Sequence, residues 1–464
     1  MKTAEKIISS EQSKLAKLKK MQSRNSGGKY FFVLLVLIAI VNILDEVTSN
    51  LTVTVQSSFV TEFFVNNPFM GKYYTYEDGL ALHSGIGVFT YVLGIFTPFY
   101  KALADKWGRK PLFVISTVGM AAGLMIIHLS SSYIMFLAGF AVISFFMGHD
   151  IQIIYILEEA PDKHRAKIYS LLKSFGILGV VLIPTLRDIL MGDDATKWRD
   201  IFLVPALIGF AATALVIVLA KDTKVFISEK TEYLSRPYEE RQREKALKKQ
   251  HKQAQRNQAG VFNGVKYIFS NKDTKSLIIA HIVFDSAMPA IALYFESAMH
   301  RAGMSTSSIT KALFMIPVIY ASITFLSGFI ADKAGRKATV TLFSFTCVAG
   351  YILFVAGILL GWNPYLVGSF AGLYQGSYWI GRDYMNVMMT EKVPTDIRAS
   401  VVGAEGLLVM IGLALGYGVT IVGMTVMPIW WACLAVSVPT VSIAAIMFAL
   451  KVKETKGVNL DTIE

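Results

Sequence analysis

The chain has 464 residues, of which 54% are hydrophobic and only 17% are charged, a composition that excludes an ordinary soluble globular protein. Its net charge of +12 comes from basic residues in the gaps between apolar runs, which favours positive-inside membrane topology over nucleic-acid binding. Cys347 and Cys433 lie inside apolar runs without metal-ligand spacing, so neither a disulfide nor a metal site is predicted, and no cofactor motif is present.

Apolar runs predict twelve membrane-spanning helices, because about 20 residues are enough to cross a bilayer. Polar residues 1–29 are rich in lysine and are predicted to form a cytoplasmic tail. Residues 30–220 would form a first six-helix bundle. Its helices are predicted at about 30–56, 80–102, 111–129, 133–157, 167–186 and 200–220.

Residues 221–275 are basic and contain no spanning run, so we interpret them as a cytoplasmic linker, either a solvated spacer or a segment that binds acidic lipids. A second bundle is predicted over 276–450, with a cytoplasmic tail at 451–464. Its helices are expected at about 276–298, 311–331, 338–361, 364–389, 400–423 and 427–450. The expected fold is an all-α plasma-membrane protein with twelve helices in two similar bundles and both termini in the cytoplasm.

Two charged motifs recur in both halves. Ala104-Asp-Lys-Trp-Gly-Arg-Lys110 returns as Ala331-Asp-Lys-Ala-Gly-Arg-Lys337, about half the chain later. Glu158-x-x-Pro-x-x-x-Arg165 is echoed by Glu391-x-x-Pro-x-x-x-Arg398 at nearly the same offset. Because the motifs keep their order, they indicate a duplicated architecture of the kind found in many transporters.

These motifs also predict a cytoplasmic gate. The glycines permit a tight turn, and the cost of burying charge holds the basic residues on the cytoplasmic side. An aspartate does nothing for topology, so we expect a breakable ion-pair latch, with a simple topology signal as the alternative. The predicted gate residues are Asp105, Gly108, Arg109, Glu158, Arg165, Asp332, Gly335, Arg336, Glu391 and Arg398.

Charged residues inside the apolar runs are expected to be functional, because charge is expensive within a bilayer. At 1.5 Å per residue, some fall near the middle of the bilayer and others in the outer half of the first helix. Carboxylates outnumber cations among them, which favours proton coupling or a cationic substrate. Structural ion pairs such as Lys173–Asp285 are the alternative, and Glu296 is placed at the outer rim with little weight.

The predicted tenth helix carries polar residues on one face. Tyr378, Arg382 and Asn386 are spaced four apart, so they share a face that we expect to line a cavity. Tyr378 and Trp379 could stack against a ring or a sugar face, although a packing role fits them equally well.

With these motifs, the chain resembles the major facilitator superfamily, and within it the sugar and metabolite porter branch. The resemblance covers nearly all of the chain except the linker. It rests on both Asp-x-x-Gly-Arg-Lys copies, Tyr155-Ile-Leu-Glu-Glu-Ala-Pro161 with Arg165, Trp198-Arg199 with Phe202, Pro205 and Ala206, Tyr294 with Ala302-Gly303, and Glu454-Thr-Lys-Gly457.

The resemblance implies alternating access by two rocking bundles, with Asp45 where proton-coupled members carry a proton-binding aspartate. The chain departs from the porter pattern at sugar-binding positions. Paired glutamines of the seventh helix correspond to Val283-Phe284 before Asp285, and the fifth-helix glutamine corresponds to Lys173. These departures favour a polar or charged organic solute over a neutral hexose.

The sequence therefore predicts a monomeric proton-coupled symporter whose partners are a small organic solute, protons and the bilayer. Proton antiport of cationic or amphipathic compounds and a sensor on a transporter scaffold are alternatives; an enzyme is not expected, because no catalytic motif appears. The predicted proton-coupling residues are Asp45 and Glu46. The predicted substrate-binding residues are Asp150, Lys173, Asp285, Tyr378, Trp379, Arg382, Asp383 and Asn386.

Overall fold

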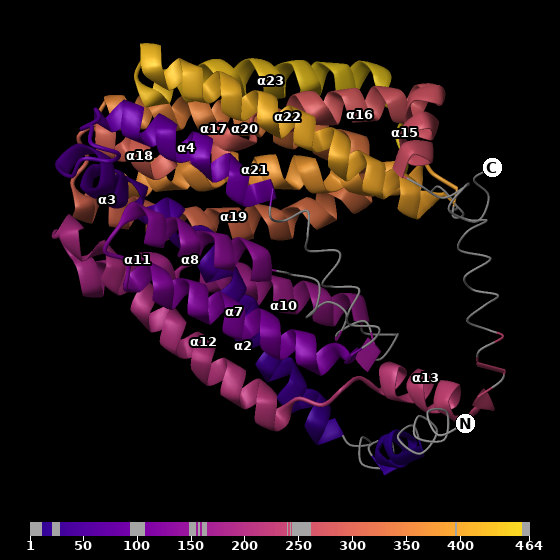
Figure 1. The fold of residues 1–464 in the computed structure, drawn as a ribbon. Helices are drawn as coiled ribbons and strands as arrows, with labels where there is room; N and C mark the ends of the chain where they lie inside the picture. The colour runs from indigo at the N-terminus through magenta and orange to yellow at the C-terminus, as the bar shows by residue number, and fades with distance from the viewer. Residues whose placement is uncertain are drawn as a thin grey trace. The chain divides into compact units, whose positions relative to one another are not determined.

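The computed structural model describes residues 12–20, 28–92, 107–147, 155, 158–159, 165–238, 240–241, 243, 261–394 and 397–456. Its regular elements are helices (Figure 1). By length and composition, 7 helices in the described part of the chain can cross a membrane. The chain divides into two compact units: Met1–Ser49, Thr90–Val180 and Phe202–Asn257 form unit 1, and Asn50–Phe89, Val181–Ile201 and Gln258–Glu464 form unit 2.

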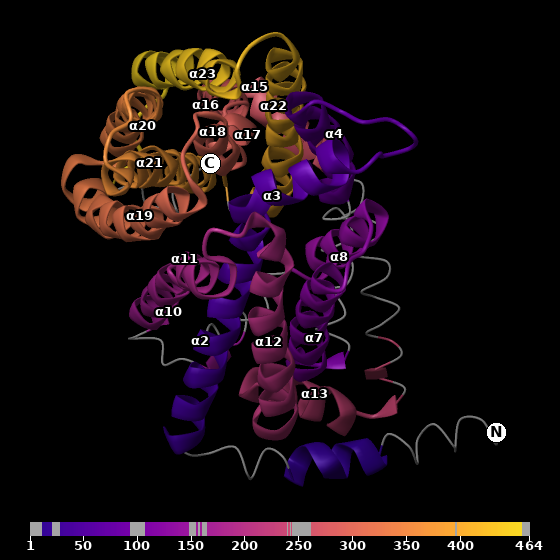
Figure 2. The same cartoon turned by 90° about the vertical axis from the view of Figure 1, so that its left-hand side faces the viewer.

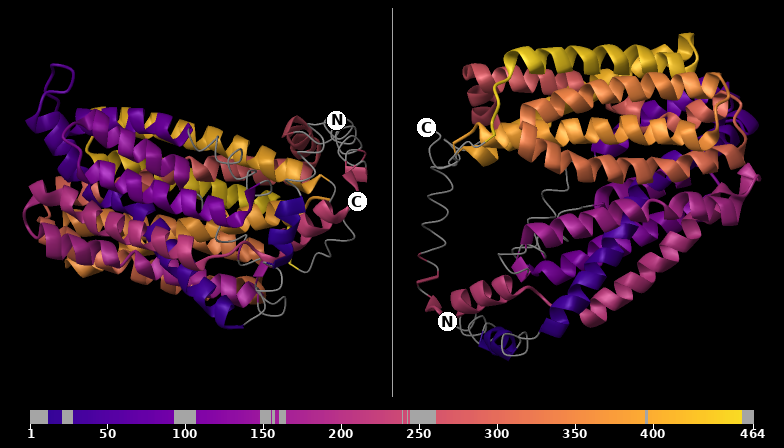
Figure 3. Two further views of the ribbon diagram at one scale, coloured as in Figure 1. Left: turned by 60° about the horizontal axis from the view of Figure 1, so that its bottom comes forward. Right: turned by 180° about the vertical axis from the view of Figure 1, so that it is seen from behind.

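Unit 1 is built around helices of the first half, which lie side by side in Figures 1 and 3. They are α2 (Gly28–Leu51), α7 (Arg109–His128), α8 (Tyr133–Phe146), α10 (Arg165–Gly179), α12 (Asp200–Leu219) and the shorter α13 (Lys224–Ser235). Its core combines apolar side chains of α2, α7, α10 and α12 with Tyr155. The continuous described parts of the predicted second and fourth helices end at Val92 and Phe146, and Tyr155 of the predicted fourth helix is also described.

Small residues let α7 and α8 approach closely. A Cβ atom on Gly123 would lie 2.9 Å from the carbonyl oxygen of Gly139, and a Cβ on Gly139 would lie 2.9 Å from the carbonyl oxygen of Gly123. Contact between two backbones at this separation requires glycine on both helices, as in many membrane bundles.

Unit 2 contains the six long helical segments of the second half with shorter pieces of the first. The long segments are α16 (Lys272–Asp285), continued by α17 (Met288–Ala292) and α18 (Phe295–Arg301), then α19 (Thr306–Ala334), α20 (Arg336–Leu359), α21 (Pro364–Glu391), α22 (Arg398–Val426) and α23 (Ile429–Lys451). The first-half pieces are η1 (Val53–Val55), α3 (Gln56–Val60), η2 (Thr61–Asn66), α4 (Tyr76–Val92), α11 (Leu182–Leu186), η5 (Arg187–Met191) and η6 (Ala195–Arg199).

Glycines also set the packing of α21 on α19, which lie next to each other in Figure 2. Gly368, Gly372 and Gly376 recur every four residues and form a stripe on α21 that faces Ala312, Ile316 and Tyr320 of α19. Outward-facing positions of the long helices are apolar and exposed, among them Phe325, Val426 and Leu450, as expected for surfaces that meet lipid.

The predicted seventh helix is interrupted twice, at 286–287 and at 293–294, and so consists of α16, α17 and α18. The first and fifth helices run past their predicted ends at about 56 and 186 and continue into the π-helical segments η2 and η5. Within the predicted linker, α13 and α15 (Val261–Ser270) are helical, and α15 packs against α22. In broken and π-helical segments, some backbone N–H and C=O groups lack a partner within the helix and can form hydrogen bonds with side chains. Such bonds occur in one of the polar clusters described below.

Candidate transport site and gates

Asp285 is the centre of a polar cluster in unit 2, here named the Asp285 cluster with Tyr378 and Arg382. The Tyr378 hydroxyl donates to Oδ1 at 2.7 Å, and Nε of Arg382 donates to both carboxylate oxygens at 2.9 and 3.1 Å. Asp285 is the last residue of α16, where the helix dipole is negative, so a cation is needed to stabilise its carboxylate. The phenyl ring of Phe284 stacks on Tyr378 with ring centroids 5.0 Å apart.

Only part of the Asp285 cluster is accessible. The Arg382 side chain is 32% exposed, whereas that of Asp285 is 2% exposed. Trp379 is half-buried and its ring lies 5.3 Å from the guanidinium carbon of Arg382. Asn386 is half-buried one turn further along α21, and Asp383 is exposed. A solute could therefore reach Arg382 and Trp379, while Tyr378 and Asp285 support the arginine from behind.

The residues predicted to couple protons lie on α2 in unit 1. Asp45 is fully buried and Glu46 is half-buried. Glu46 faces α10, because a Cβ on Gly176 would lie 3.2 Å from its Cγ. The side-chain amide of Asn42 donates to the carbonyl of Leu172 at 2.9 Å and joins the same two helices. Lys173 is on α10 but its side chain is not described, and Asp150 lies outside the described residues.

The first gate motif forms a polar cluster in unit 1, here named the Glu158 cluster: Arg109, Glu158, Asp222 and Thr223. Arg109 forms an ion pair with Glu158 at 2.6 Å, and the Thr223 hydroxyl donates to the same carboxylate. Asp222 accepts the backbone N–H of Lys110 at 2.9 Å at the N-terminus of α7. Asp105 lies outside the described residues, and the side chain of Arg165 is not described.

The second gate motif forms the equivalent Glu391 cluster in unit 2: Arg336, Glu391, Glu454 and Thr455. Arg336 and Glu391 form an ion pair at 3.5 Å, and the Thr455 hydroxyl donates to Glu391 at 2.5 Å. Glu454 accepts the backbone N–H groups of Arg336 and Lys337, each at 3.0 Å, at the N-terminus of α20. The two clusters thus have the same arrangement of an ion pair, a threonine and a capping carboxylate. In each cluster, all of the interacting residues come from the same half of the sequence.

Other predicted gate residues take different positions. Arg398 donates to the carbonyl of Val393 at 3.1 Å and so covers the end of α21. Asp332 is exposed. Gly108 and Gly335 have φ of 104° and 96°, and a Cβ on either one would collide with the carboxylate that caps the following helix, Asp222 or Glu454. Glycine is required at both positions by the backbone conformation and by this contact.

The two capping carboxyls differ in acidity. Burial raises the pKa of Glu454, but hydrogen bonds from the backbone N–H groups of Lys456, Thr455, Lys337 and Arg336 outweigh it, so the pKa falls below its usual value. Burial also raises the pKa of Asp222, and the hydrogen bonds from Lys110 and Arg109 leave the net shift upward. The difference follows from the deeper burial of Asp222.

At the other end of α19, a buried ion pair joins five elements of unit 2: η1, α3, η5, α18 and α19. Arg187 and Glu296 pair at 3.5 Å with side chains 1% and 0% exposed. Glu296 also accepts the backbone N–H and the hydroxyl of Ser57 at 2.8 and 2.6 Å, at the start of α3. Arg187 donates to the carbonyl of Thr54 and to the hydroxyl of Thr310. We name these five residues the Glu296 cluster; Glu296, which carried little weight among the sequence-based candidates, is buried at its centre.

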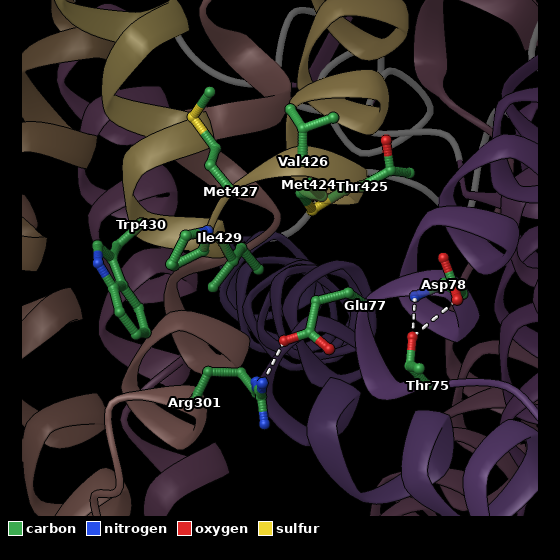
Figure 4. A pocket seen from close by; sticks show the side chains of 11 residues that line it. Thr75, Glu77, Asp78, Arg301, Met424, Thr425, Val426, Met427, Ile429 and Trp430 are labelled. Atoms are coloured by element: carbon green, nitrogen blue, oxygen red, sulfur yellow. Dashed lines mark hydrogen bonds and ion pairs between the residues drawn. The ribbon is translucent and has the colours of Figure 1, made fainter.

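Two cavities lie in this part of unit 2. One, of about 380 Å³, is lined by Arg187, Arg199, Glu62 and His300 together with short polar side chains. The other, of about 510 Å³, is shown in Figure 4, where Glu77 points toward Arg301 and Asp78 toward Thr75. Each cavity contains one ion pair, Glu77–Arg301 in the cavity of Figure 4 and Glu62–Arg199 at 2.6 Å in the other. Neither cavity contains the Asp285 cluster.

Comparison with known proteins decides the family. The family model of the Major Facilitator Superfamily matches residues 51–417, which is most of the chain. The chain belongs to the major facilitator superfamily. The resemblance inferred from the motifs and the predicted twelve-helix, two-bundle fold class are therefore confirmed, and the protein is a multi-pass membrane protein of this superfamily.

The names of similar proteins indicate different transported compounds. The minor myo-inositol transporter IolF of Bacillus subtilis is 24% identical over 68% of each chain. The facilitated glucose transporter member 10 of solute carrier family 2 from Danio rerio is 23% identical over 56% of this chain, and the match spans about half of that protein (49%). The multidrug resistance protein MdtL of Shigella flexneri is 26% identical over 31% of this chain and 37% of its own.

Solved structures of the superfamily share the fold. The crystal structure of a D-xylose-proton symporter has a TM-score of 0.67 at 14% identity, covering 92% of this chain and 99% of that one. A bacterial homologue of the lysosomal transporter Spinster has a TM-score of 0.64 at 14% identity, covering 92% and 97% of the two chains. At this identity the likeness concerns the fold alone.

Several residues of these clusters were not predicted from the sequence. Asp222 and Thr223 could have been found, because Asp222-Thr-Lys after the sixth helix repeats as Glu454-Thr-Lys after the twelfth. Outside these clusters, Glu405 was also missed, although it is a single carboxylate inside the apolar run 400–423 and a charge in such a run indicates a functional residue. No sequence motif or spacing indicated that Arg187 and Thr54 would interact, because they are far apart in the sequence and meet only in the folded chain.

Proposed function

We propose that this major facilitator is a proton-coupled symporter for a small polar or charged organic solute. The observation that carries the proposal is the burial of carboxylates in membrane helices: Asp45 is fully buried in α2, and Asp285 is buried against Arg382. A buried carboxylate can bind and release a proton during a transport cycle, because protonation removes the cost of its charge.

Arg382 and Trp379 support a polar solute. A guanidinium that is partly exposed and held by a buried aspartate offers fixed donors to hydroxyl or carboxylate oxygens. The adjacent Trp379 ring offers an apolar face for the carbon skeleton of such a solute. Lys173, Asp150, Asp383 and Asn386 complete the proposed binding set, and Glu46 assists Asp45 in proton coupling.

Alternating access is supported by clusters at both ends of α19. The Glu296 cluster lies at its beginning and the Glu391 cluster at its end, roughly 40 Å apart by the rise of 29 helical residues. We propose that the Glu158 and Glu391 clusters face the cytoplasm and that the Glu296 cluster is an outer gate. The outer gate joins helices from both sequence halves, as a closed external gate requires.

A stability screen tests the proposed function. The purified protein is heated with myo-inositol, D-xylose, gluconate and an aromatic amine at pH 5.5 and pH 7.5. A transported solute should raise the melting temperature, because it binds the folded state, and should do so unequally at the two pH values if protonation is linked. Equal shifts at both pH values, followed by uptake into proteoliposomes that ignores a pH gradient, would contradict proton coupling.

Efflux by proton antiport is the second candidate, favoured by the similarity to MdtL, which is named a multidrug resistance protein. The same buried carboxylates would serve it, with proton and solute moving in opposite directions. A hydrophobic amine that stabilises the protein more than any hydroxylated solute would favour this alternative.

A further inference from the structure

A second titratable pair lies in unit 2, one turn from the Asp285 cluster along α16. Nδ1 of His281 lies 3.0 Å from Oε1 of Glu405, and the two side chains are 1% and 3% exposed. Among the described residues, Nε2 of His281 has no hydrogen-bond partner. Neither residue belongs to a gate cluster or to the Asp285 cluster.

Close packing of two helices brings this pair together. Gly412 of α22 faces the carbonyl of Ile282, and Gly416 faces the carbonyl of Ser286, so that no side chain separates the two backbones. Glu405 lies two turns before Gly412 on α22, and His281 immediately precedes Ile282 on α16. The glycines of α22 thus set the distance at which an imidazole and a carboxylate can share a proton.

The charge balance of the buried pair depends on one proton. With that proton bound, the pair is neutral overall, either as imidazolium and carboxylate or as imidazole and carboxylic acid. Without it, the pair carries one negative charge in a site closed to water, which is unfavourable unless a cation compensates. The pair is therefore a proton-binding site by its composition and burial.

Neighbouring groups connect this site to the proposed solute site. His281 and Asp285 are four residues apart and share a face of α16. Both Asp285 and Arg382 act electrostatically on Glu405. The other ionisable groups on the helices packed against α16 are Lys266 and Tyr267 on α15, Tyr365, Tyr374, Tyr378, Asp383, Tyr384 and Glu391 on α21, Arg398 and Tyr417 on α22, and Cys433 and Lys451 on α23.

We propose that His281 and Glu405 form a second proton-binding site, whose proton is exchanged during transport and controls how firmly Asp285 holds Arg382. Loss of the proton makes Glu405 a competitor of Asp285 for the guanidinium, and binding of the proton returns Arg382 to Asp285. This inference rests on the proposed proton-coupled function and places a coupling proton in the C-terminal half, in addition to Asp45.

Infrared difference spectroscopy of the full chain in lipid nanodiscs tests the site with protons alone. Spectra are recorded between about pH 4 and pH 9, the range in which carboxyl and imidazole groups titrate. The wild type should show a band of the protonated pair, either the carbonyl band of a carboxyl group or the ring band of an imidazolium, that disappears as the pH rises. Glu405→Gln should lose this band, whereas Glu232→Gln, at an exposed position of α13, should keep it.

A second variant keeps the test decisive if Glu405→Gln does not fold. His281→Asn retains an N–H donor near the position of Nδ1 but cannot titrate, so the midpoint of the Glu405 band should shift by about one pH unit or more. Identical carboxyl and imidazolium bands in wild type and Glu405→Gln, or an unchanged midpoint in His281→Asn, would overturn the proposal.

The two proposals fail in different ways. If wild-type uptake ignores a pH gradient while the Glu405 band titrates, the proposed symport is wrong and the proton site stands. If uptake follows the gradient equally in wild type and in folded Glu405→Gln, symport stands and the role of this site in coupling is overturned.

Discussion

At the residue scale, Asp285 depends on two donors from one face of α21. Tyr378→Phe removes the hydrogen bond at 2.7 Å and leaves the ring stack on Phe284 in place. We expect the free energy of unfolding to fall by about 1.5–3 kcal/mol, because the acceptor is a buried carboxylate. Denaturant unfolding in mixed micelles measures this change.

Tyr365→Phe is the matched control, because Tyr365 is 47% exposed at the start of the same helix. It should leave the stability of the protein within about 0.5 kcal/mol of wild type. Equal stabilities of the two variants would show that the hydrogen bond from Tyr378 does not support Asp285.

Glu454 gives a pH dependence with a defined sign. Its pKa is lowered in the folded protein from an ordinary value of 4.5. A lowered pKa contributes stability that is present above pH 4.5 and is lost as the pH falls through the folded-state pKa. Wild type should therefore be more stable than Glu454→Gln at pH 7, and the difference should shrink in acid.

Thermal melting of both proteins from pH 7 down to about pH 3.5 follows this difference. Glu232→Gln, which removes an exposed carboxylate of α13, should show no comparable pH-dependent difference. A gap between wild type and Glu454→Gln that stays constant over the whole range would contradict the assignment of Glu454 as a charged helix cap.

At the element scale, the turn before α20 requires glycine. Gly335 has φ of 96° and faces the Glu454 carboxylate. Gly335→Ala should destabilise the protein by about 1–2 kcal/mol from backbone strain alone, and by more if the carboxylate is displaced. Gly108→Ala should behave alike, because the Glu158 cluster repeats the arrangement.

Gly328→Ala is the control for this substitution, since Gly328 lies inside α19 with no neighbour near a new Cβ. It should be neutral or stabilise the protein by up to about 1 kcal/mol, because alanine favours the helix. Denaturant unfolding compares the three variants, and a similar effect at 335 and 328 would contradict the special role of the turn.

Long elements could be predicted from the sequence because their signal is local. The run predicted at 338–361 is α20 at Arg336–Leu359, and that predicted at 427–450 is α23 at Ile429–Lys451. The break between α16 and α17 has a local signal that was not used, because Asp285-Ser286 interrupt the apolar run and Pro289 stands at the start of α17. The break between α17 and α18 could not be predicted, because Leu293 and Tyr294 continue the apolar pattern. That break depends on tertiary packing, which a hydropathy pattern does not contain.

Site residues could be predicted where charge interrupts an apolar run. Asp285 and Arg382 were identified in this way, but their pairing with each other was not predicted; the alternative interpretation named Lys173 as a possible partner of Asp285. The pairing of Arg187 with Glu296 could not be inferred, because only the folded chain brings these distant residues together. The sequence identifies which charged residues lie in apolar runs. Helix packing determines which of these residues form ion pairs.

At the scale of the whole molecule, the Glu296 cluster should behave as a coupled unit. Arg187→Met leaves the Glu296 carboxylate buried without its cation and should cost roughly 3–5 kcal/mol. The double variant Arg187→Met, Glu296→Met removes both charges and should be less destabilised than Arg187→Met alone. Unfolding of both single variants and the double variant gives the coupling energy, and additive effects would contradict the pairing.

The central claim is that solute and proton move together, and solute-evoked pH change in proteoliposomes tests it most directly. Vesicles loaded with a pH-sensitive dye, with potassium and valinomycin to hold the membrane potential, receive each solute that stabilises the protein. Symport predicts that adding solute outside acidifies the lumen, and that Asp45→Asn abolishes the change. Alkalinisation would indicate antiport, and no pH change with any transported solute would contradict proton coupling.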